Sequence, residues 1–525
     1  MKTCSYPGLV EVLLVGLALS IGWGIRGNYG HEHGAMVPGA FAAMSAVLLS
    51  GRSDWQRRIA FFGMFGALGW SFGGSMSYGH VIGYTHSGDS LSVVYGFACL
   101  YVIGFLWGAL GGAGTTLPAA LSRENLTVFF TPLLVVFVSW LLEYVAVETW
   151  FPVDEAYRHQ SPLYWHDTDW LAAVLATVAV LMLTVVRREV DLGSSLALHM
   201  SVGWLLGALV LVGVLGLRMT PPRGDNWAGC VGMVIGVWVY CWRHGLPQVA
   251  RASLICGFVG GFGFATAQLL KLIGITTGWQ TNWHSLMEQT YGFINGIGVA
   301  VAMFWLARAC PEVRDEPPVR RWTEYGAVAF VLLGITYLNL RKNPQTWTAT
   351  GDFPSDLYGL SAVSWFDIGY VIIAIAFVAL AIAHCRRALP VIPETWLGAG
   401  ELLYLLFLWW MIVGNFERAL LQFAPVRLVT EGVVYFNGIV CTVGVLMLAR
   451  AGVSTAVQSA INWHRNTVRI ICLGSALAVL SVVGDWAIVR AVYGDKPAPH
   501  SAKHIRFGPN ATAKDAALQP AQPHP

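Results

Sequence analysis

The 525-residue chain is 56% hydrophobic and 12% charged, and its formal net charge is +3. Because soluble domains carry about 25% charged residues, this composition excludes a soluble globular protein and indicates a chain that lipid surrounds over most of its length. The small net charge gives no support for nucleic-acid binding. Most of the nine cysteines lie in apolar runs and no two share a predicted outer loop, so we expect free thiols.

Apolar runs long enough to cross a membrane follow one another along the chain. They lie near residues 8–24, 34–50, 59–77, 92–113, 128–149, 169–186, 194–217, 227–242, 252–272, 286–308, 323–340, 366–384, 398–415, 428–449 and 468–489. The sequence therefore predicts an all-α polytopic membrane protein with about 14–15 transmembrane helices. The first run is interpreted as a retained helix, because further apolar runs follow at once. Residues 493–525 are expected to form a disordered tail.

Lysine and arginine in the short loops predict the orientation of the chain. With the N-terminus in the cytoplasm, the pairs Arg57–Arg58, Arg187–Arg188 and Arg386–Arg387 all fall on the cytoplasmic side. We therefore expect a multi-pass protein of a cell inner membrane with a cytoplasmic N-terminus.

Short sequence matches recur in order at a nearly constant offset. Gly24-Ile-Arg26 matches Gly216-Leu-Arg218, and Tyr95-Gly-Phe97 matches Tyr291-Gly-Phe293. Each copy holds an even number of helices, so both copies would have the same orientation, with a site between them near mid-membrane. We expect two parallel six-helix repeats, residues 1–192 and 193–390, followed by about three additional transmembrane helices in residues 391–492.

Two parallel six-helix units are also the layout of the major facilitator transporters, which is an analogy of architecture. The loop Gly51–Arg58 falls where those transporters carry a Gly…Asp-Arg…Gly-Arg-Arg loop. Its spacing differs and the second glycine is missing, so it assigns no family. The glycine-rich runs Gly63–Gly74 and Gly257–Gly263 lie inside predicted helices, and we interpret them as helix-packing surfaces.

The stretch Ile21–Gly34 places one arginine, one glutamate, two histidines and five glycines between two apolar runs. A charge in hydrocarbon is costly unless it is paired or hydrated, so such groups are candidate functional residues. Arg26 recurs as Arg218 in the second copy, and arginine offers a fixed fork of donors for carboxylate, phosphate or hydroxyl groups. The alternative is that each arginine extends to the membrane interface.

Three histidines are weak candidates for a metal site, because imidazole is a common zinc ligand. His31 and His33 lie at the predicted outer ends of the first two helices, and His80 lies at the outer ends of the third and fourth. The His-x-His pattern alone is unspecific, and the second copy lacks it. Solvated capping residues or a substrate or proton site are the alternatives, and we expect neither a metal nor a cofactor.

Carboxylates inside predicted helices are candidates for proton coupling or substrate contact. Glu143 and Glu288 are the two that we single out, and the alternative for them is an internal salt bridge with Arg26, Arg218 or Lys271.

A helix that begins near Trp283 would carry Trp283, Met287, Glu288, Tyr291 and Asn295 along one face. An aromatic face beside amides and carboxylates suits a sugar or another amphipathic ligand. An aromatic belt at the membrane interface would give the same pattern without any ligand.

Together these patterns favour an integral membrane transporter of a small polar solute, a sugar or an organic anion, with coupling to protons. The expected partners are this small-molecule substrate and the lipid bilayer, without nucleic acid. The candidate substrate-binding residues are Arg26, Glu32, His33, His80, Arg218, Trp283, Glu288 and Asn295, and the candidates for proton coupling are Glu32, Glu143 and Glu288.

Two alternatives to a transporter stay open. The first is a membrane-embedded transferase or hydrolase that acts on a lipid-linked substrate at the outer face, with His31, Glu32, Asp154 and Glu155 as acid–base groups. The second is a structural membrane subunit that transports nothing. The internal duplication favours the transporter over both.

Overall fold

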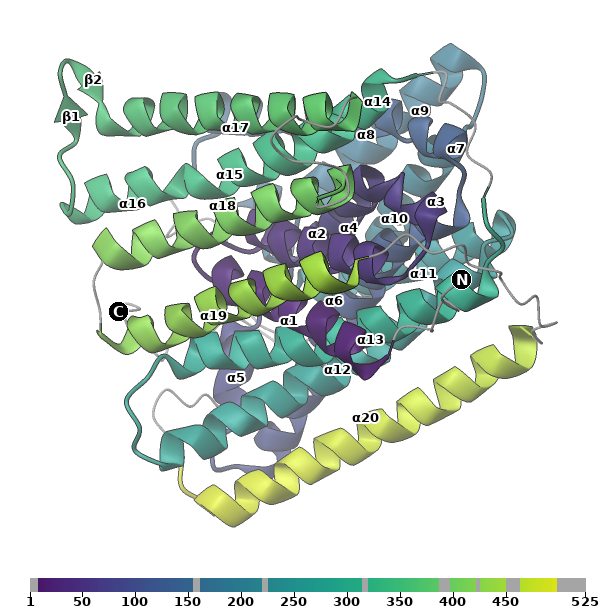
Figure 1. Ribbon diagram of the computed structural model, residues 1–525. Helices are drawn as coiled ribbons and strands as arrows, with labels where there is room; N and C mark the ends of the chain where they lie inside the picture. Colours follow the sequence, from purple (N-terminus) through teal and green to yellow (C-terminus); the bar gives the residue numbers. More distant parts are fainter. Residues whose placement is uncertain are drawn as a thin grey trace. The chain divides into compact units, whose positions relative to one another are not determined.

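The computed structural model describes residues 8–153, 161–219, 225–313, 320–386, 397–421, 425–449 and 463–497. Almost all of its secondary structure is helical, and a helix occupies every one of the predicted apolar runs (Figure 1). Within the described residues, 13 helices are long and apolar enough to cross a membrane. The chain is therefore an all-α, multi-pass membrane protein.

The chain forms two compact units, which do not follow the order of the sequence. The first unit comprises Met1–Gly74, Trp107–Thr127 and Arg251–Val479, and the second comprises Ser75–Leu106, Val128–Ala250 and Leu480–Pro525. These two units do not test the proposed repeats, residues 1–192 and 193–390, which stay a prediction.

The first unit holds most of the long helices. Its elements are α1 (Leu9–Arg26), α2 (Glu32–Leu49), α3 (Ser53–Gln56), α4 (Ile59–Gly73), the second part of α6 (Ser90–Ala120), α7 (Arg123–Thr127), α12 (Pro247–Thr276), α13 (Trp283–Ala309), α14 (Trp322–Ala329), α15 (Thr336–Leu340), α16 (Lys342–Thr350), the two-residue strands β1 (Asp356–Leu357) and β2 (Leu360–Ser361), α17 (Ala362–Arg386), α18 (Ala399–Leu421), α19 (Pro425–Leu448) and the first part of α20 (Trp463–Tyr493). A π-helical segment, Phe330–Ile335, joins α14 to α15.

Glycines let the central helices of the first unit approach one another closely. Helix α1 packs along α13, and a Cβ atom on Gly296 would lie only 2.7 Å from the Cα atom of Gly16. Helix α2 packs along α4, where a Cβ atom on Gly66 would lie 2.8 Å from the carbonyl oxygen of Gly39. Small residues at these crossings allow backbones to meet. The glycine run of α4 is therefore a helix-packing surface, as the sequence indicates.

The second unit contains shorter helices, with a similar glycine contact at its centre. Its elements are α5 (Gly79–Tyr84), the first part of α6, α8 (Phe130–Trp150), a 3-10 turn (Pro162–Asp167), α9 (Trp170–Arg187), α10 (Leu192–Gly207) with a π-helical extension (Ala208–Val214), α11 (Asn226–Arg243) and the end of α20. A Cβ atom on Gly203 of α10 would lie 2.4 Å from the carbonyl oxygen of Gly232 on α11.

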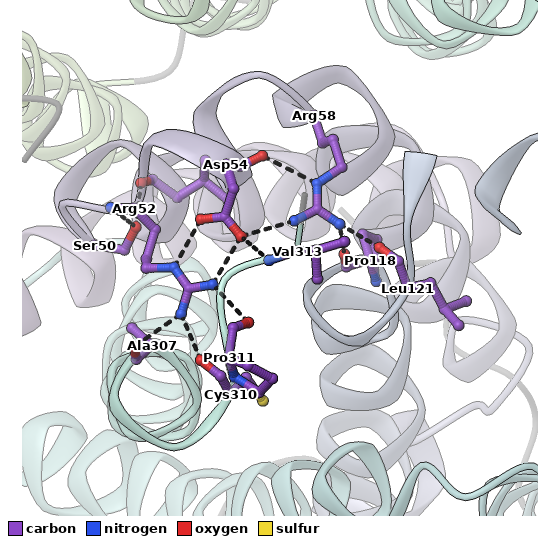
Figure 2. A network of polar contacts seen from close by, with 11 residues as sticks. Ser50, Arg52, Asp54, Arg58, Pro118, Leu121, Ala307, Cys310, Pro311 and Val313 are labelled. Atoms are coloured by element: carbon purple, nitrogen blue, oxygen red, sulfur yellow. Dashed lines mark hydrogen bonds and ion pairs between the residues drawn. The ribbon is translucent and has the colours of Figure 1, made fainter. Parts of the chain in front are cut away.

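A buried network of charges holds the loop between α2 and α4 in place, and we call Arg52, Asp54 and Arg58 the Asp54 clasp (Figure 2). Asp54 is fully buried, and its two carboxylate oxygens accept from Arg52 Nε and Arg52 NH2, each at 2.7 Å. Arg58 NH2 donates to the same carboxylate at 3.2 Å, and the backbone N–H of Val313 donates to it at 3.2 Å.

The two arginines of the Asp54 clasp also bind helix ends far away in the sequence. Arg52 donates to the carbonyl oxygens of Ala307 at 3.0 Å and Cys310 at 2.8 Å, at the end of α13 (Figure 2). Arg58 donates to the carbonyl oxygen of Pro118 at 3.0 Å, near the end of α6. Carbonyls at the end of a helix lack intrahelical donors and carry partial negative charge, so the guanidinium groups satisfy them. The clasp joins the ends of α6 and α13 to the loop between α2 and α4 within the first unit.

Candidate functional site

The centre of the first unit contains a buried ion pair between Arg26 and Glu288. Arg26 lies in the last turn of α1, Glu288 lies in the first turns of α13, and their exposed fractions are 3% and 2%. Arg26 NH1 lies 2.9 Å from Glu288 Oε1. Arg26 NH2 lies 2.7 Å from Nδ1 of His31. For Glu288, the sequence leaves open either a functional role or a salt bridge with Arg26, and the structure contains this salt bridge. The pair brings together two candidate substrate-binding residues.

Aromatic rings surround the guanidinium group of Arg26. Its Cζ atom lies 5.1 Å from the ring centroid of Trp23 and 5.1 Å from that of Trp107. Tyr291, one turn beyond Glu288, lies 4.5 Å from Trp23, and Phe264 of α12 stacks on Tyr291 at 4.6 Å. Aromatic faces attract a cation electrostatically, and the attraction grows when water is excluded. We call Arg26, Glu288, His31 and these aromatic rings the Arg26 site.

The glycines of the stretch 21–34 make room for the Arg26 site. A Cβ atom on Gly27 would lie 2.6 Å from Glu288 Oε2, and one on Gly24 would lie 2.8 Å from Cγ of Gln289. A Cβ atom on Gly34 would lie 2.7 Å from the carbonyl oxygen of Arg26. At these distances an added Cβ atom would force the neighbouring atoms to shift. The glycine content of the stretch therefore follows from how closely α13 and α2 pack around Arg26.

Several buried polar atoms beside Arg26 have no hydrogen-bond partner among the residues that the structure describes. They include the indole nitrogens of Trp23 and Trp70 and the side-chain oxygens of Gln289 and Asn295. Asn295 is fully buried, and its amide nitrogen donates to the hydroxyl of Tyr291 at 3.1 Å. Buried polar groups are nearly always paired, so a water molecule or a polar ligand is needed to complete them.

The loop between α1 and α2 is held by residues that the sequence did not single out. The side chain of Asn28 donates to Oδ1 of Asn415 at 2.6 Å, and the carbonyl oxygen of Asn28 accepts from Arg418 at 2.7 Å. Lys342 donates to the carbonyl oxygen of Tyr29. The loop that follows Arg26 is thereby fixed by α16 and α18.

The stretch His31-Glu32-His33 lies at the edge of this site. His31 is exposed on one side, yet partial loss of solvation and the adjacent Arg26 guanidinium lower its pKa to about 4. Glu32 is exposed, and His33 is half-buried with its carbonyl oxygen accepting from Asn339 at 3.1 Å.

The second unit contains three other candidates from the sequence. Arg218 pairs with Asp225, and the hydroxyl of Tyr95 donates to the carbonyl oxygen of Arg218 at 2.8 Å. His80 is exposed on α5, and Glu143 is half-buried on α8. Each copy of Gly-(Ile/Leu)-Arg thus places an arginine beside a carboxylate, while the predicted symmetry between the two arginines stays a prediction.

Trp283 and the two acidic residues named for the enzyme alternative are the remaining candidates. Trp283 is half-buried at the start of α13, and its indole nitrogen donates to the carbonyl oxygen of Trp279 at 3.0 Å. Asp154 and Glu155, named for the enzyme alternative, lie outside the described residues. Within the described part of the chain, no group of three His, Cys, Asp or Glu side chains is arranged to hold a metal ion.

The Arg26 site is therefore a buried guanidinium paired with the carboxylate of Glu288 and surrounded by aromatic rings. Such a site is suited to a small ligand with one anionic group and an apolar body. A comparison of the chain with protein-family models, with curated proteins and with solved structures finds no match.

Proposed function

We propose that this protein is a membrane transporter of a small organic anion, that it couples anion movement to protons, and that the Arg26 site binds the anion. The observation that carries the proposal is the buried guanidinium of Arg26, which forms an ion pair with the carboxylate of Glu288 at 2.9 Å. A substrate carboxylate has the same chemistry as Glu288 and can take its place at the guanidinium fork.

The exchange of carboxylates gives a reason for proton coupling. When a substrate anion binds Arg26, Glu288 loses its countercharge within a desolvated environment. An unpaired carboxylate in such surroundings is stabilised by taking up a proton. The substrate anion and one proton would therefore enter the site together, and the site would keep the same net charge throughout.

The surroundings of Arg26 favour an organic anion over a neutral sugar. A sugar offers hydroxyl groups but no charge with which to replace Glu288 at the guanidinium. The rings of Trp23, Trp107 and Tyr291 provide an apolar surface for the body of an organic anion. The indole nitrogen of Trp23 and the amide oxygen of Asn295 supply further hydrogen-bonding groups.

Transport of this anion is part of the proposal, as are the inner-membrane location and the cytoplasmic N-terminus. The Arg26 site lies among helices that are long and apolar enough to cross a membrane. Close glycine contacts along α1, α2, α4 and α13 allow helices to slide without a barrier from interlocked side chains. Two parallel repeats, if present, would place such a site between two moving halves.

Uptake into proteoliposomes tests the proposal. The purified full-length protein is reconstituted, and the uptake of radiolabelled monocarboxylates and dicarboxylates is measured with and without an inward proton gradient. We expect the gradient to drive uptake of at least one anion in the wild type, while E288Q loses the response to the gradient. E148Q is the control, because Glu148 is exposed on α8.

The same assay separates the three carboxylates that the sequence proposes for coupling. E32Q and E143Q are measured beside E288Q, and a loss of proton drive in E288Q alone assigns the coupling to Glu288. Unchanged proton-driven uptake in E288Q would refute that role. The absence of gradient-driven uptake for every anion, with the wild type correctly reconstituted, would refute the transport proposal.

A further inference from the structure

A second buried carboxylate lies near the Arg26 site and differs from Glu288 in its partners. Glu431 of α19 is 5% exposed within the apolar span Val426–Leu448. The amide nitrogen of Asn415 donates to Glu431 Oε2. Among the described residues, no cation lies within ion-pair distance of this carboxylate, whereas Glu288 has Arg26 at 2.9 Å.

Hydrogen bonds connect Glu431 with the loop that follows Arg26. Asn415 donates to Glu431 and accepts from the side chain of Asn28 at 2.6 Å. Asn28 is half-buried, and its neighbours Gly27 and Gly30 are exposed. A line of three side chains, Asn28, Asn415 and Glu431, thus runs from a solvent-accessible loop to a buried carboxylate, and we call it the asparagine relay.

The backbone beside Glu431 also contacts the residue that follows Glu288 in α13. The carbonyl oxygen of Thr430 accepts from the side-chain amide of Gln289 at 3.3 Å. Gln289 directly follows Glu288 in α13. One turn further along α19, Val434 lies against Gly24, where an added Cβ atom would come within 2.8 Å of it. Helix α19 therefore packs against α1 and is joined to α13 by a hydrogen bond.

The charged groups near Glu431 on these helices have other partners or lie beyond ion-pair distance. They are Arg427 on α19, Arg418 and Glu417 on α18, Lys342 on α16, and Arg26 and Glu288 on α1 and α13. Arg418 donates to the carbonyl oxygen of Asn28, and Lys342 donates to that of Tyr29. The hydroxyl of Tyr370 lies 3.5 Å from Glu417. The charge of Arg427 acts on Glu431, but none of these described cations lies within ion-pair distance of its carboxylate.

We propose that Glu431 binds a proton reversibly and that the asparagine relay transmits its protonation state to the Arg26 site. The ionised carboxylate only accepts hydrogen bonds, while the neutral carboxyl also presents an O–H donor. A change at Glu431 therefore changes which atoms of the Asn415 amide can bond to it, and Asn28 must adjust in turn. The proton comes from the aqueous phase and returns to it, so no other reactant is needed.

This proton site differs in role from Glu288. Glu288 is paired with Arg26 and takes up a proton when a substrate replaces it, whereas Glu431 takes up its proton in the substrate-free protein. The coupling to substrate rests on the proposed function, but proton binding at Glu431 does not. The two can therefore fail separately.

Infrared difference spectroscopy of the purified full-length protein in lipid tests proton binding directly. A protonated carboxyl group has a carbonyl stretching band that an ionised carboxylate lacks. We expect a pH titration of the wild type to contain one such band that E431Q removes and E417Q retains. N415L should keep the band at a shifted frequency, because it removes the donor to Glu431 Oε2. E431D should restore a band if E431Q folds poorly.

Hydrogen–deuterium exchange of the peptide that contains residues 27–31 tests the relay without any substrate. After correction for intrinsic exchange rates, we expect the exchange of the wild-type loop to change with pH over the range in which the Glu431 band titrates. E431Q and N415L should abolish that change, and E417Q should retain it. Identical carboxyl bands in the wild type and E431Q would overturn proton binding at Glu431. Retention of the pH response in N415L would overturn the relay.

Failure of the proposed function gives a different pattern. If no organic anion is taken up by proteoliposomes while the Glu431 band and the loop response are present, the transport proposal is wrong and the proton site stands. If uptake is proton-driven but the band is unaffected in E431Q, the inference about Glu431 is wrong and the transport proposal stands.

Discussion

Replacement of Asp54 by asparagine is the most severe change that the structure predicts for stability. D54N keeps the size of the side chain but removes the negative charge between Arg52 and Arg58, both of which are 1% exposed. Arg52 keeps its carbonyl partners at the end of α13, and Arg58 keeps its bond to Pro118. Two buried guanidinium groups would then share no counter-ion, and breaking a buried pair in this way costs about 3–5 kcal/mol.

This loss corresponds to roughly 10²- to 10⁴-fold in the ratio of folded to unfolded protein. Because large membrane proteins often unfold irreversibly, the half-life of the folded protein at a fixed temperature is the practical measurement. It is obtained from size-exclusion chromatography after heating in detergent. D352N is the control, since Asp352 is exposed and accepts a hydrogen bond from the hydroxyl of Thr350 at 2.6 Å. Equal half-lives for D54N and D352N would refute the assignment of a stabilising role to the clasp.

The pH dependence of the half-life gives an independent check on the same residue. Burial alone would raise the pKa of Asp54, but the hydrogen bonds and charges of Arg52 and Arg58 hold it below its ordinary value of 3.8. The stabilisation is therefore complete above pH 3.8, and it is lost as the pH falls from there through the lower pKa of the folded state. D54N should lack this component of acid sensitivity.

The remaining predictions concern the Arg26 site. G27A should reduce proton-driven anion uptake and destabilise the protein by about 1–3 kcal/mol, because the new methyl group must displace Glu288. G369A, with nothing within 4 Å on α17, should be neutral or slightly stabilising in the same thermal assay. R26K keeps the charge but loses the planar fork, so the affinity for the anion should fall about tenfold or more in a binding titration; an unchanged affinity would show that the fork is not used. Because the pKa of His31 is lowered to about 4, this residue lowers the stability of the folded protein as the pH falls from 6.5 toward 4 and has no such effect above pH 6.5. H31Q should flatten the profile of thermal stability against pH across that interval. An unaltered profile would contradict the assignment.

The sequence predicted the helices well because hydropathy alone decides which segments lipid can solvate. A helix lies in every predicted apolar run, although the helix Ile59–Gly73 ends earlier than its run and is shorter than the other spans. Arg26 and Glu288 were also recognisable, since a charged residue inside an apolar run is conspicuous. Their direct contact was one of several pairings that the sequence left open, because it depends on the close crossing of α1 and α13.

Other parts of the site carried no usable signal in the sequence. Trp107 and Phe264 are two aromatic residues among many in the chain, and only the packing of α6 and α12 brings them to Arg26. Asn28 and Asn415 are uncharged and lie far apart in the sequence, so neither periodicity nor spacing points to their hydrogen bond. The loop Gly51–Arg58 falls where the major facilitator transporters carry an arginine-rich loop, which gives no hint of the clasp. The clasp depends on the ends of α13 and α6, which the fold places around the loop.

In the proposed function, an organic anion replaces Glu288 at Arg26, and Glu288 then takes up a proton. Proton uptake on anion binding measures this most directly, with a pH-sensitive dye and the purified protein in weak buffer. We expect the wild type to take up about one proton per anion bound. E288Q should bind the anion without taking up a proton, and R26Q should not bind the anion. Anion binding by R26Q with wild-type affinity, or binding by the wild type without any proton uptake, would contradict this proposal.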